Sequence, residues 1–584
     1  MKKTLLIPIA GFLLTGCTLP FIAGTSSAIP SSDSIPSIPV ESSDVSSGDS
    51  ASTSTATDTP SVTTTATIST TTATSTKTST ATKTSTATKT STATSTKTST
   101  ATTTSSSSSG EDDDPGYTVF GTAKTRLHSY PSKNCFYDDC LPDTIGELKL
   151  LVIPVYTTDA QTFTNQELEN IELVYNGEAS QTGWQSLRSY YQTSSYGELT
   201  MHATVVEPYQ LPFSSTSFNT SYNKDKSGSW FLGQLKKVID AHRSYINEED
   251  FDEDDDGYID AVEFVWKNNG YDASMDSNYD GWWAFTSVSD SNPSTANPVL
   301  GAFFWSPVAH IANGFYTPNI DSHTLVHETG HLLGADDYYS YNQDTDGAPA
   351  GGADIMDLNI GDHCAVTKAL YGWVNPYVPS GTKDEFEITL NDFQSTGDCL
   401  MLVDPASWNG TQYDEYFMAE YYTPTGLNAT DVKGYPEWNN RYYNYGKLYQ
   451  KAGLKLMHAD FRPGDFDRSG NFKGFASNPL SNDSVVVANN TSEYSYSGYR
   501  LLEAVPASGT NYFIGENKDY SSLGKQNILF GTSKYGCGST TFTSSTVSKI
   551  LANKTKLNNG NPIPYSFTVI AQDDTSITLR VSKN

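Results

Sequence analysis

The chain has few of the residues that usually build metal and redox sites. Its 584 residues include 6 cysteines and 9 histidines, and no two cysteines have the spacing of a zinc-binding motif. Apart from Cys17, the neighbours Cys135 and Cys140 are near enough to close a small loop, and Cys364 with Cys399 forms a second candidate pair. The count without Cys17 is odd, so at least one thiol is left over, and the sequence does not fix the connectivity.

Positive charge is also scarce. There are 36 lysines and arginines against 66 aspartates and glutamates, which gives a formal net charge of −30 at pH 7. A polyanion would be repelled by such a chain, so nucleic acid and anionic lipid are excluded as partners. Acidity on this scale suits a secreted protein that binds calcium, and it is equally compatible with an ordinary acidic surface.

The N-terminal hydrophobic run is too short for a stable transmembrane helix. Lys2 and Lys3 precede an apolar run from Leu5 to Leu14, which is the pattern of a signal peptide. The run ends in Leu-Thr-Gly-Cys, which resembles a bacterial lipobox with Cys17 as the lipid-bearing first residue of the mature chain. We therefore expect residues 1–17 to be a lipoprotein signal peptide and the protein to be extracellular, anchored to the bacterial cell membrane. The alternative is that Cys17 is a spare thiol in the leader.

Aromatic residues are almost absent from the next segment. From Thr18 to about Ser109 the chain consists largely of Ser, Thr and Ala, with a near-repeat of Ser-Thr-Ala-Thr-Lys-Thr. Such a composition buries too little apolar surface to offset the entropy of ordering. We expect residues 18–116 to be a disordered tether, whose roughly 90 residues would span about 50 Å on average. The remainder is long enough for two domains, which we place at 117–380 and 381–584.

One short motif contains two of the rare histidines. The stretch HETGHLLGADD matches His-Glu-x-x-His-x-x-Gly-x-x-Asp, and on a helix His327 and His331 lie one turn apart on the same face. Glu328 stands where the general base of this motif is found. Gly334 permits the left-handed turn that ends the helix, so that the chain can bring Asp337 back to the metal. We expect a catalytic Zn²⁺ ion held by His327, His331 and Asp337, with one position left for water.

Two neighbours of this motif are alternatives to its ligands. His323 precedes His331 by two helical turns, about 12 Å along the axis, which is too far for both to bind one metal ion. We expect His323 to pack or to support the site. Asp336 lies next to Asp337, and the sequence leaves open which of the two carboxylates binds.

A second motif has the spacing of a calcium loop. Oxygen donors and a glycine fall on the expected positions, so that the predicted Ca²⁺ ligands are Asp252, Asp254, Asp256, Tyr258, Asp260 and Glu263. The following residues, AVEFVW (261–266), indicate a strand, so the loop would belong to a fold other than the EF-hand. The alternative is a solvated acidic turn. Three weaker relatives start at Asp276, Asn342 and Asp465, lack an acidic residue at position 12, and are as well explained by Asx-rich turns.

Hydrophobic patterns predict an α/β region followed by a β-rich one. Residues 147–156 indicate a buried strand, 184–201 a helix leading into a strand, and 229–246 a core-facing helix. Beyond about residue 381 the pattern changes to short strands separated by turn residues, which predicts an all-β sandwich. The expected strands lie at 385–390, 399–403, 416–422, 453–461 and 499–505, with a final hairpin at 567–581.

Together these segments resemble the immune inhibitor A (thuringilysin) family of secreted zinc metallopeptidases. The resemblance runs from about residue 148 through the catalytic region and continues more weakly beyond. It is carried by LRSYYQTSSYGEL (187–199), the acidic loop and strand at 252–265, HETGHLLGADDYY, the turn around Met356, and LYGWVNP (370–376). The chain departs from the family at Asp336, where a proline is usual, and at Ser340, where an aspartate is usual.

The resemblance implies a metzincin-like zincin fold, with a twisted sheet and an active-site helix, that binds zinc and calcium. It carries His327, His331 and Asp337 over as zinc ligands and Glu328 as the catalytic base. Met356 would form the methionine turn that packs below the metal without binding it.

We therefore expect a cell-surface zinc-dependent endopeptidase that hydrolyses extracellular proteins or peptides. It would be a monomer that reaches the membrane only through its N-terminal lipid. One alternative is an adhesin or glycan-binding protein that keeps a catalytically silent zincin scaffold, and another is a zinc hydrolase that acts on a non-protein amide. Tyr338 and Tyr339 are candidates for a second oxyanion donor on the basis of their proximity in sequence alone.

Overall fold

The computed structural model describes most of the chain after the Ser/Thr-rich segment. The described residues are 15–16, 114–122, 141–225, 228–244, 246–269, 281–289, 292–311, 320–340, 348–433, 448–466, 472–476, 485, 487–489, 499–510, 524–546 and 556–584. Nearly all of the predicted tether lies outside these ranges. So do Cys17, Cys135, Cys140 and most of the three weaker acidic loops.

The first sheet has a parallel centre. Strand β3 pairs in parallel with β4 and β7, and β7 pairs in parallel with β10, whereas β8 and β1 continue the sheet antiparallel. These strands are β1 (Thr15–Gly16), β3 (Gly146–Tyr156), β4 (Leu199–Val205), β7 (Val262–Lys267), β8 (Phe285–Val288) and β10 (Ala302–Pro307). A short strand, β5 (Tyr209–Gln210), adds to the end of β3. The continuous apolar run of β3 is buried on both faces, as expected for a central parallel strand.

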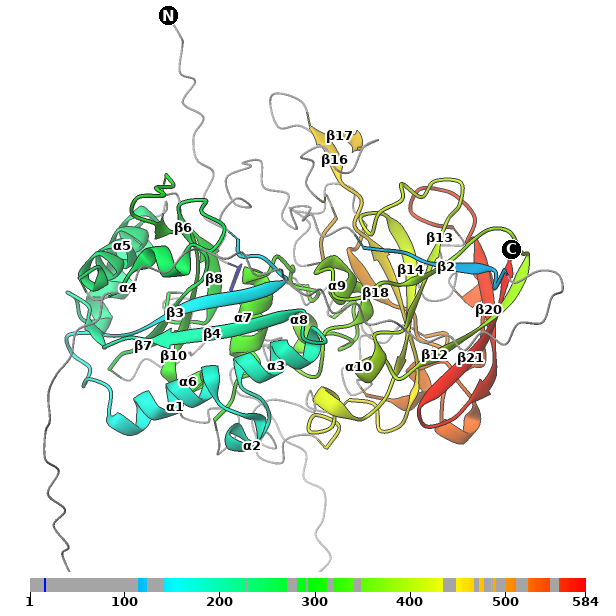
Figure 1. Ribbon diagram of the computed structural model, residues 1–584, viewed down its shortest axis with the longest axis horizontal. Coiled ribbons are helices and arrows are strands. Elements are labelled where there is room, and N and C mark those ends of the chain that lie inside the picture. The colour runs from blue at the N-terminus through cyan, green and yellow to red at the C-terminus, as the bar shows by residue number, and fades with distance from the viewer. Residues whose placement is uncertain are drawn as a thin grey trace, which may run out of the picture. The chain divides into compact units, whose positions relative to one another are not determined.

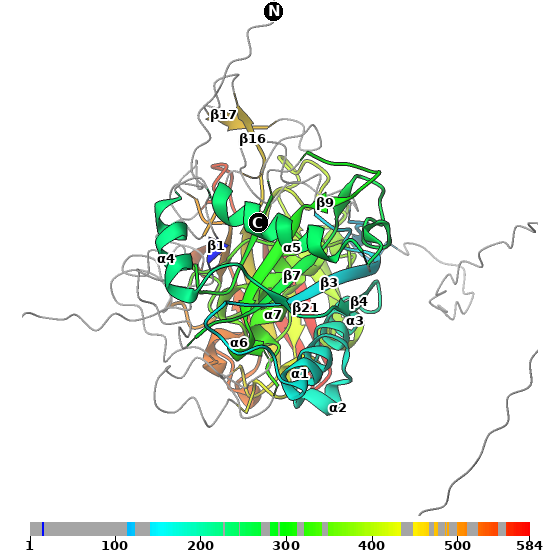
Figure 2. The same cartoon turned by 90° about the vertical axis from the view of Figure 1, so that its left-hand side faces the viewer.

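Helices cover both faces of this sheet (Figures 1 and 2). On one face lie α4 (Ser215–Lys224) and α5 (Ser229–His242), and on the other lie α1 (Asn165–Asn176), α3 (Leu187–Ser194), α6 (Val308–Ile311) and α7 (His323–Leu332). Alternate residues of β3 serve the two sides, with Leu151 in the core below α5 and Leu150 in the core that includes α7. The region is therefore mixed α/β, with α7, the helix that carries the histidine motif, packed against the sheet.

Short elements connect these layers. They are α2 (Ala179–Thr182), η1 (Glu248–Phe251), β6 (Tyr258–Ile259), β9 (Val299–Leu300), α8 (Ile355–Leu358), α9 (Ala365–Leu370), α10 (Phe393–Thr396) and η2 (Gly426–Asn428). Strands β6 and β9 form a separate parallel pair beside the acidic loop.

The C-terminal region contains two larger sheets that share one core. The 6-stranded sheet runs β18 (Leu502–Ala504), β15 (Gly453–Asp460), β14 (Glu415–Tyr422), β13 (Cys399–Val403), β11 (Tyr377–Pro379) and β2 (Tyr117–Val119). The 4-stranded sheet runs β12 (Glu385–Asn391), β21 (Ser576–Lys583), β20 (Tyr565–Gln572) and β19 (Thr541–Phe542), and β16 (Gly464–Phe466) pairs with β17 (Phe472–Phe475) apart from both. Inward residues such as Ile388, Leu402 and Leu579 lie in the same hydrophobic core. This is the predicted β-sandwich arrangement.

The predicted boundary after residue 380 does not separate the sheets. Strands β2 and β11 lie on the N-terminal side of that boundary yet belong to the C-terminal sheet, and residues 113–584 form one compact unit. Polar contacts join the two regions: Lys455 of β15 donates to the carbonyl of Ala353 (2.8 Å) and pairs with Glu420 of β14 (2.7 Å). Glu420 in turn accepts the amide of Ala365 at the start of α9. The β-rich region thus holds the loop that lies beneath α7.

The candidate pair Cys364 and Cys399 does not form a disulfide. Both thiols are free and fully buried. Cys364 precedes α9 with its sulfur 3.8 Å from the Thr367 hydroxyl, whereas Cys399 lies on β13 in the hydrophobic core. Burial raises the pKa of both thiols well above the ordinary value, so they behave as small core residues.

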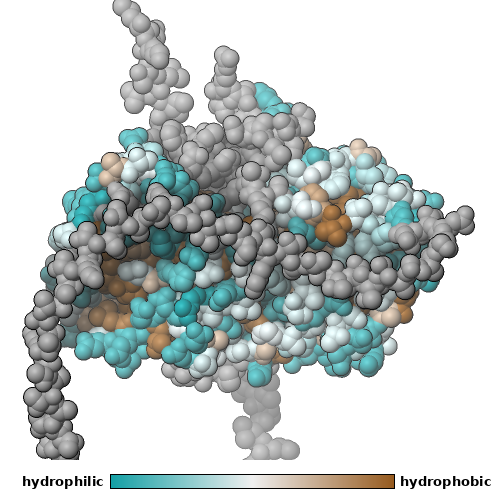
Figure 3. All heavy atoms as spheres, in the orientation of Figure 1, coloured by the Kyte–Doolittle hydropathy of each residue, from teal (hydrophilic) through white to brown (hydrophobic). Residues whose placement is uncertain are grey.

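The surface is mostly hydrophilic. Figure 3 shows small, separate hydrophobic patches on one face of the molecule. Among the described residues, the exposed large hydrophobic side chains are Val119 and Ile570. Within that same part of the chain, no helix has the length and apolar character needed to cross a membrane.

Candidate metal centre

Helix α7 and the turn after it build the centre. Every residue of α7 is buried, including its polar residues, so the helix has no solvent-facing stripe. The helix ends where Gly334 adopts a left-handed conformation, with φ of +96°. The amide of Ala335 then donates to the carbonyl of Gly330, and the chain turns back towards the helix. Asp337 is thereby returned to the face that carries His327 and His331.

Three donor atoms converge at this turn. The Oδ1 atom of Asp337 lies 3.1 Å from Nε2 of His327 and 3.3 Å from Nε2 of His331. Ligand atoms from all three residues lie within 4.8 Å of one another, and all three side chains are buried. Asp336 is not part of this group, and its Oδ1 atom accepts the amide of Asp337 (2.9 Å). The geometry therefore favours Asp337 over Asp336 as the third ligand.

The hydrogen bonds of the two imidazoles fit a metal ion. Nδ1 of His327 lies 2.9 Å from the carbonyl of Ile355, and Nδ1 of His331 lies 2.9 Å from the carbonyl of Ala335. A ring nitrogen beside a carbonyl must carry the proton, which leaves a lone pair on each Nε2. Two lone pairs and a carboxylate facing one point repel one another unless a cation lies between them. Two imidazole nitrogens and one carboxylate oxygen form a donor set of the kind that binds catalytic zinc.

When no metal ion is bound, protons partly neutralise the same donor groups. Burial disfavours the charged imidazolium, but the Asp337 carboxylate overrides this effect and raises the pKa of His331 to about 9. Burial alone would raise the pKa of Asp337, yet the charge of His331 holds it well below its usual range. Burial raises the pKa of Asp336 to about 8, with Asp337 adding to the effect. A metal ion would therefore bind in competition with protons.

Met356, the residue predicted to form a methionine turn, packs against the middle of α7 at Gly330. It is fully buried in α8, and its amide donates to Asp354, the residue that caps that helix. A Cβ atom added at Gly330 would overlap the Met356 sulfur and lie 3.1 Å from its methyl carbon. The glycine in the middle of α7 thus allows the thioether to approach the helix backbone.

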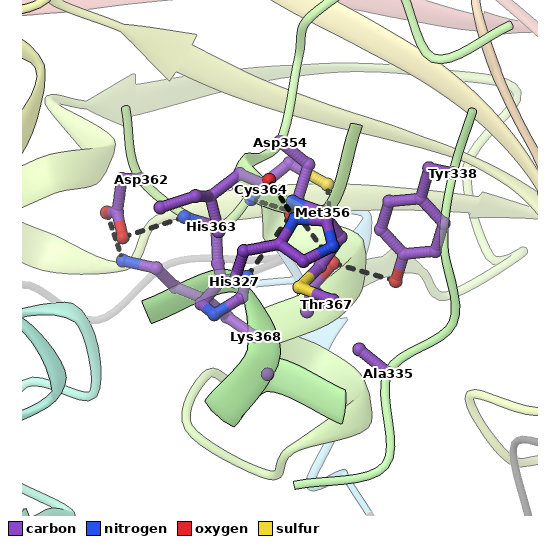
Figure 4. Close-up of polar contacts among 12 residues, drawn as sticks. His327, Ala335, Tyr338, Asp354, Met356, Asp362, His363, Cys364, Thr367 and Lys368 are labelled. Atoms are coloured by element: carbon purple, nitrogen blue, oxygen red, sulfur yellow. Dashed lines mark hydrogen bonds and ion pairs between the residues drawn. The ribbon is translucent and has the colours of Figure 1, made fainter. Parts of the chain in front are cut away.

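Asp354 ties this turn to the next helix. Its carboxylate also accepts the amide of Cys364 (2.7 Å) and the hydroxyl of Thr367 (2.7 Å), and it lies 3.2 Å from Nδ1 of His363 (Figure 4). The hydroxyl of Tyr338 reaches the same Thr367 at 2.9 Å. Thr367 donates to Asp354, so Tyr338 must donate to Thr367 and cannot serve as an oxyanion donor. The other candidate oxyanion donor is Tyr339, whose ring lies 6.3 Å from that of His327.

Glu328 is also buried, on the side of α7 that meets the sheet. Its Oε2 atom lies 3.1 Å from the hydroxyl of Thr286 on β8, and its backbone carbonyl lies 2.9 Å from the same hydroxyl. His323 lies away from the metal ligands, stacked on Trp184 at a ring distance of 3.6 Å and paired with Asp321 and Asp431. The prediction that His323 supports the helix rather than binds the metal agrees with these contacts.

The acidic loop gathers three of its predicted ligands. Asp252, Asp254 and Asp256 form a group that could hold a metal ion. Oδ1 of Asp252 is buried and has no hydrogen-bond partner among the described residues. A cation bound to the loop would satisfy this oxygen. Gly257 has φ of +91°, and an added Cβ would lie 2.6 Å from the amide nitrogen of Ser294.

The other predicted calcium ligands divide. Burial raises the pKa of Asp260 to about 7, and the charge of Asp254 is the largest of those that raise it further. Asp260 therefore lies close to the other acidic residues of the loop. Tyr258 follows the loop directly and donates its amide to Asp256 (2.7 Å). Glu263 is not in the loop, and its prediction as a calcium ligand is wrong. It lies on β7, whose pleat turns it towards α7.

Glu263 instead forms a buried network behind α7. Tyr175 of α1 donates to its Oε2 (2.6 Å), and the Thr329 hydroxyl lies 3.3 Å from its Oε1. That hydroxyl lies closer to the carbonyl of Leu325, at 2.8 Å, so its proton goes there. A protonated Oε1 of Glu263 can then donate to Thr329. Burial raises the pKa of Glu263 to about 8, which is consistent with a neutral carboxylic acid.

No local sequence pattern indicates the contact of Thr286 or the role of Glu263. Thr286 lies 42 residues from the glutamate that it contacts, and Tyr175 lies 88 residues from Glu263. The chain matches no protein-family model and no curated protein. Its function therefore has to be inferred from the chemistry of these residues.

The contact between Gly330 and Met356 predicts a selective effect of a single methyl group. Gly330→Ala should destabilise the protein by about 1–3 kcal/mol, the usual cost of overpacking, and should lower zinc affinity. The matched control is Gly233→Ala in α5, where an added Cβ meets nothing within 4 Å, and this change should be neutral or slightly stabilising. Urea denaturation and zinc titration measure both effects. Equal behaviour of the two variants would show that Met356 does not press on the helix.

The neutral state of Glu263 predicts a pH effect on stability. The folded protein keeps the proton up to about pH 8, whereas the unfolded chain releases it near the ordinary value of 4.5, so this group makes stability fall as pH rises between those values. Glu263→Gln retains the shape and removes the titration, so its unfolding free energy should fall less steeply over that range. Urea denaturation at several pH values checks this. Glu387→Gln on exposed β12 is the matched control, and slopes equal to wild type in both variants would contradict a neutral Glu263.

Proposed function

We propose that the protein is a zinc-dependent endopeptidase with His327, His331 and Asp337 as zinc ligands and Glu328 as general base. The observation that carries the proposal is the convergence of the three donor atoms, with each Nδ1 held by a backbone carbonyl. The adjacent glutamate and the methionine packed below the helix support a metzincin-like zincin fold. The resemblance to the immune inhibitor A family points to peptide bonds as the substrate.

Each residue has a separate chemical task. Bound zinc would polarise a water molecule and the carbonyl of the scissile bond. Glu328 would take a proton from that water as it attacks and would pass the proton to the leaving amine. The backbone carbonyls of Ile355 and Ala335 fix the tautomer and orientation of the two imidazoles. Burial excludes bulk water from these groups, so the charges act with little screening.

We further propose a structural calcium ion in the acidic loop. Its ligands would be the carboxylates of Asp252, Asp254, Asp256 and Asp260 and an oxygen of Tyr258, without Glu263. The unpartnered oxygen of Asp252 supports this assignment. The loop joins η1 to β6, which pairs with β9, so the ion would stabilise η1 and this two-stranded sheet.

The setting of the enzyme is proposed on the sequence alone. A lipobox ending in Cys17 would attach the chain to the outer side of a bacterial membrane, and the Ser/Thr-rich segment would carry the enzyme away from that surface. The substrates would then be extracellular proteins or peptides.

Removal of the general base should abolish hydrolysis. Glu328→Gln keeps the shape of the side chain but cannot accept the proton, so we expect at least about a hundredfold loss of kcat with zinc content unchanged. Digestion of an unbiased peptide library by the zinc-loaded protein, with and without chelator, measures the activity. Near-normal hydrolysis by the variant would overturn the mechanism. If wild type is also inactive but binds glycans, the adhesin alternative would replace the proposal.

The zinc ligands are tested by metal content in the same preparations. Asp337→Ala should lower bound zinc, whereas Asp336→Ala should leave it largely in place, because Asp336 faces the backbone. The opposite result would move the third ligand to Asp336.

Calcium should act on stability rather than on the chemistry. A ligand specific for the folded state stabilises it by about 2.7 kcal/mol at a hundredfold excess over Kd, so millimolar calcium should raise the Tm of the zinc-loaded protein. The double variant Asp254→Ala with Asp256→Ala should lose most of that rise. Glu263→Gln should keep it, because Glu263 lies outside the loop. Identical melting of the double variant and wild type at every calcium concentration would remove calcium from the account.

A further inference from the structure

Strand β8 carries one polar side chain to the catalytic face of the sheet. Phe285 belongs to the core on the α5 side, and the alternation of a strand turns the next residue, Thr286, towards α7. Thr286 is 6% exposed, with β1 (Thr15–Gly16) paired beside it on the outer side of β8. It approaches α7 at Glu328.

The Thr286 hydroxyl meets Glu328 at two points. It lies 2.9 Å from the backbone carbonyl and 3.1 Å from Oε2 of the carboxylate. A hydroxyl has one proton to donate, and an ionised carboxylate is a stronger acceptor than a carbonyl. When Glu328 is ionised, the hydrogen bond to Oε2 is therefore the favoured one.

We propose that Thr286 is a positioning residue that orients the Glu328 carboxylate for proton transfer. This inference rests on the proposed function. A glutamate side chain has several rotatable bonds, and a general base must lie within hydrogen-bond reach of the proton that it removes. Thr286 holds Oε2 from the sheet, while the backbone of α7 fixes the other end of the side chain.

The position of residue 286 on β8 also explains why a threonine suits it. The sheet supplies a rigid support, since β8 pairs with β10 through Thr286 and its neighbours. A β-branched residue has a restricted χ1 angle, so the hydroxyl is directed with little entropy cost. Serine could supply the hydroxyl with less restraint, and valine could supply the shape without the hydroxyl.

Three substitutions test this role in the full-length, zinc-loaded protein. Thr286→Val should lower kcat by about 10- to 100-fold, the equivalent of one lost hydrogen bond to a charged group, with KM and zinc content little changed. Thr286→Ser should restore most of kcat. Thr286→Cys, a weak donor of similar size, should be intermediate and serves as the test if the valine variant does not fold. Thr389→Val, which makes the same change at an exposed position on β12, is the matched control and should behave as wild type.

The outcomes separate this inference from the proposed function. An inactive wild type that binds zinc defeats the proposed function itself. An active wild type with equally active Thr286→Val and Thr286→Cys variants defeats only the role of Thr286. If Thr286→Val loses stability or zinc while kcat per bound zinc stays normal, the hydroxyl merely braces the helix through the carbonyl of Glu328, and the positioning role is wrong.

Discussion

Electrostatic repulsion among three buried donors is the constraint on which the region around α7 depends. His327, His331 and Asp337 direct their donor atoms to one point, and each is too deeply buried for water to screen the repulsion. Two backbone carbonyls fix the imidazoles, and the turn at Gly334 fixes the carboxylate. Holding the three donors together therefore costs folding free energy, and a bound metal ion would offset that cost.

The β-rich region completes the floor of this centre. Lys455 and Glu420 hold the loop that contains Met356, and Asn489 donates to the carbonyl of Tyr338 just after the third ligand (2.8 Å). The amide of Ala504 on β18 donates to the carbonyl of Pro349 (2.9 Å). The β-rich region is therefore more than an accessory domain, because it supports the residues below α7.

The convergence of His327, His331 and Asp337 was predictable because they lie within 11 residues on one helix and its turn, where spacing alone fixes their relation. Spacing was misleading at Glu263. Spacing placed it in the calcium loop, but the chain after Asp260 is a strand, and the pleat of β7 turns the side chain inward. Helix α5 ends at His242, earlier than residue 246, and β18 covers only Leu502–Ala504 of the expected 499–505. Thr286, Lys455 and Glu420 act on residues 42 to 102 positions away, a relation that no local pattern records.

The central claim is that this chain holds zinc through two imidazoles and one carboxylate. X-ray absorption at the zinc edge of the purified, zinc-loaded protein tests it directly, with metal content measured on the same sample. We expect one zinc ion per chain, with two imidazole nitrogens and oxygen ligands at about 2.0–2.2 Å and no sulfur. A spectrum without imidazole scattering, or a protein that retains no zinc, would contradict it.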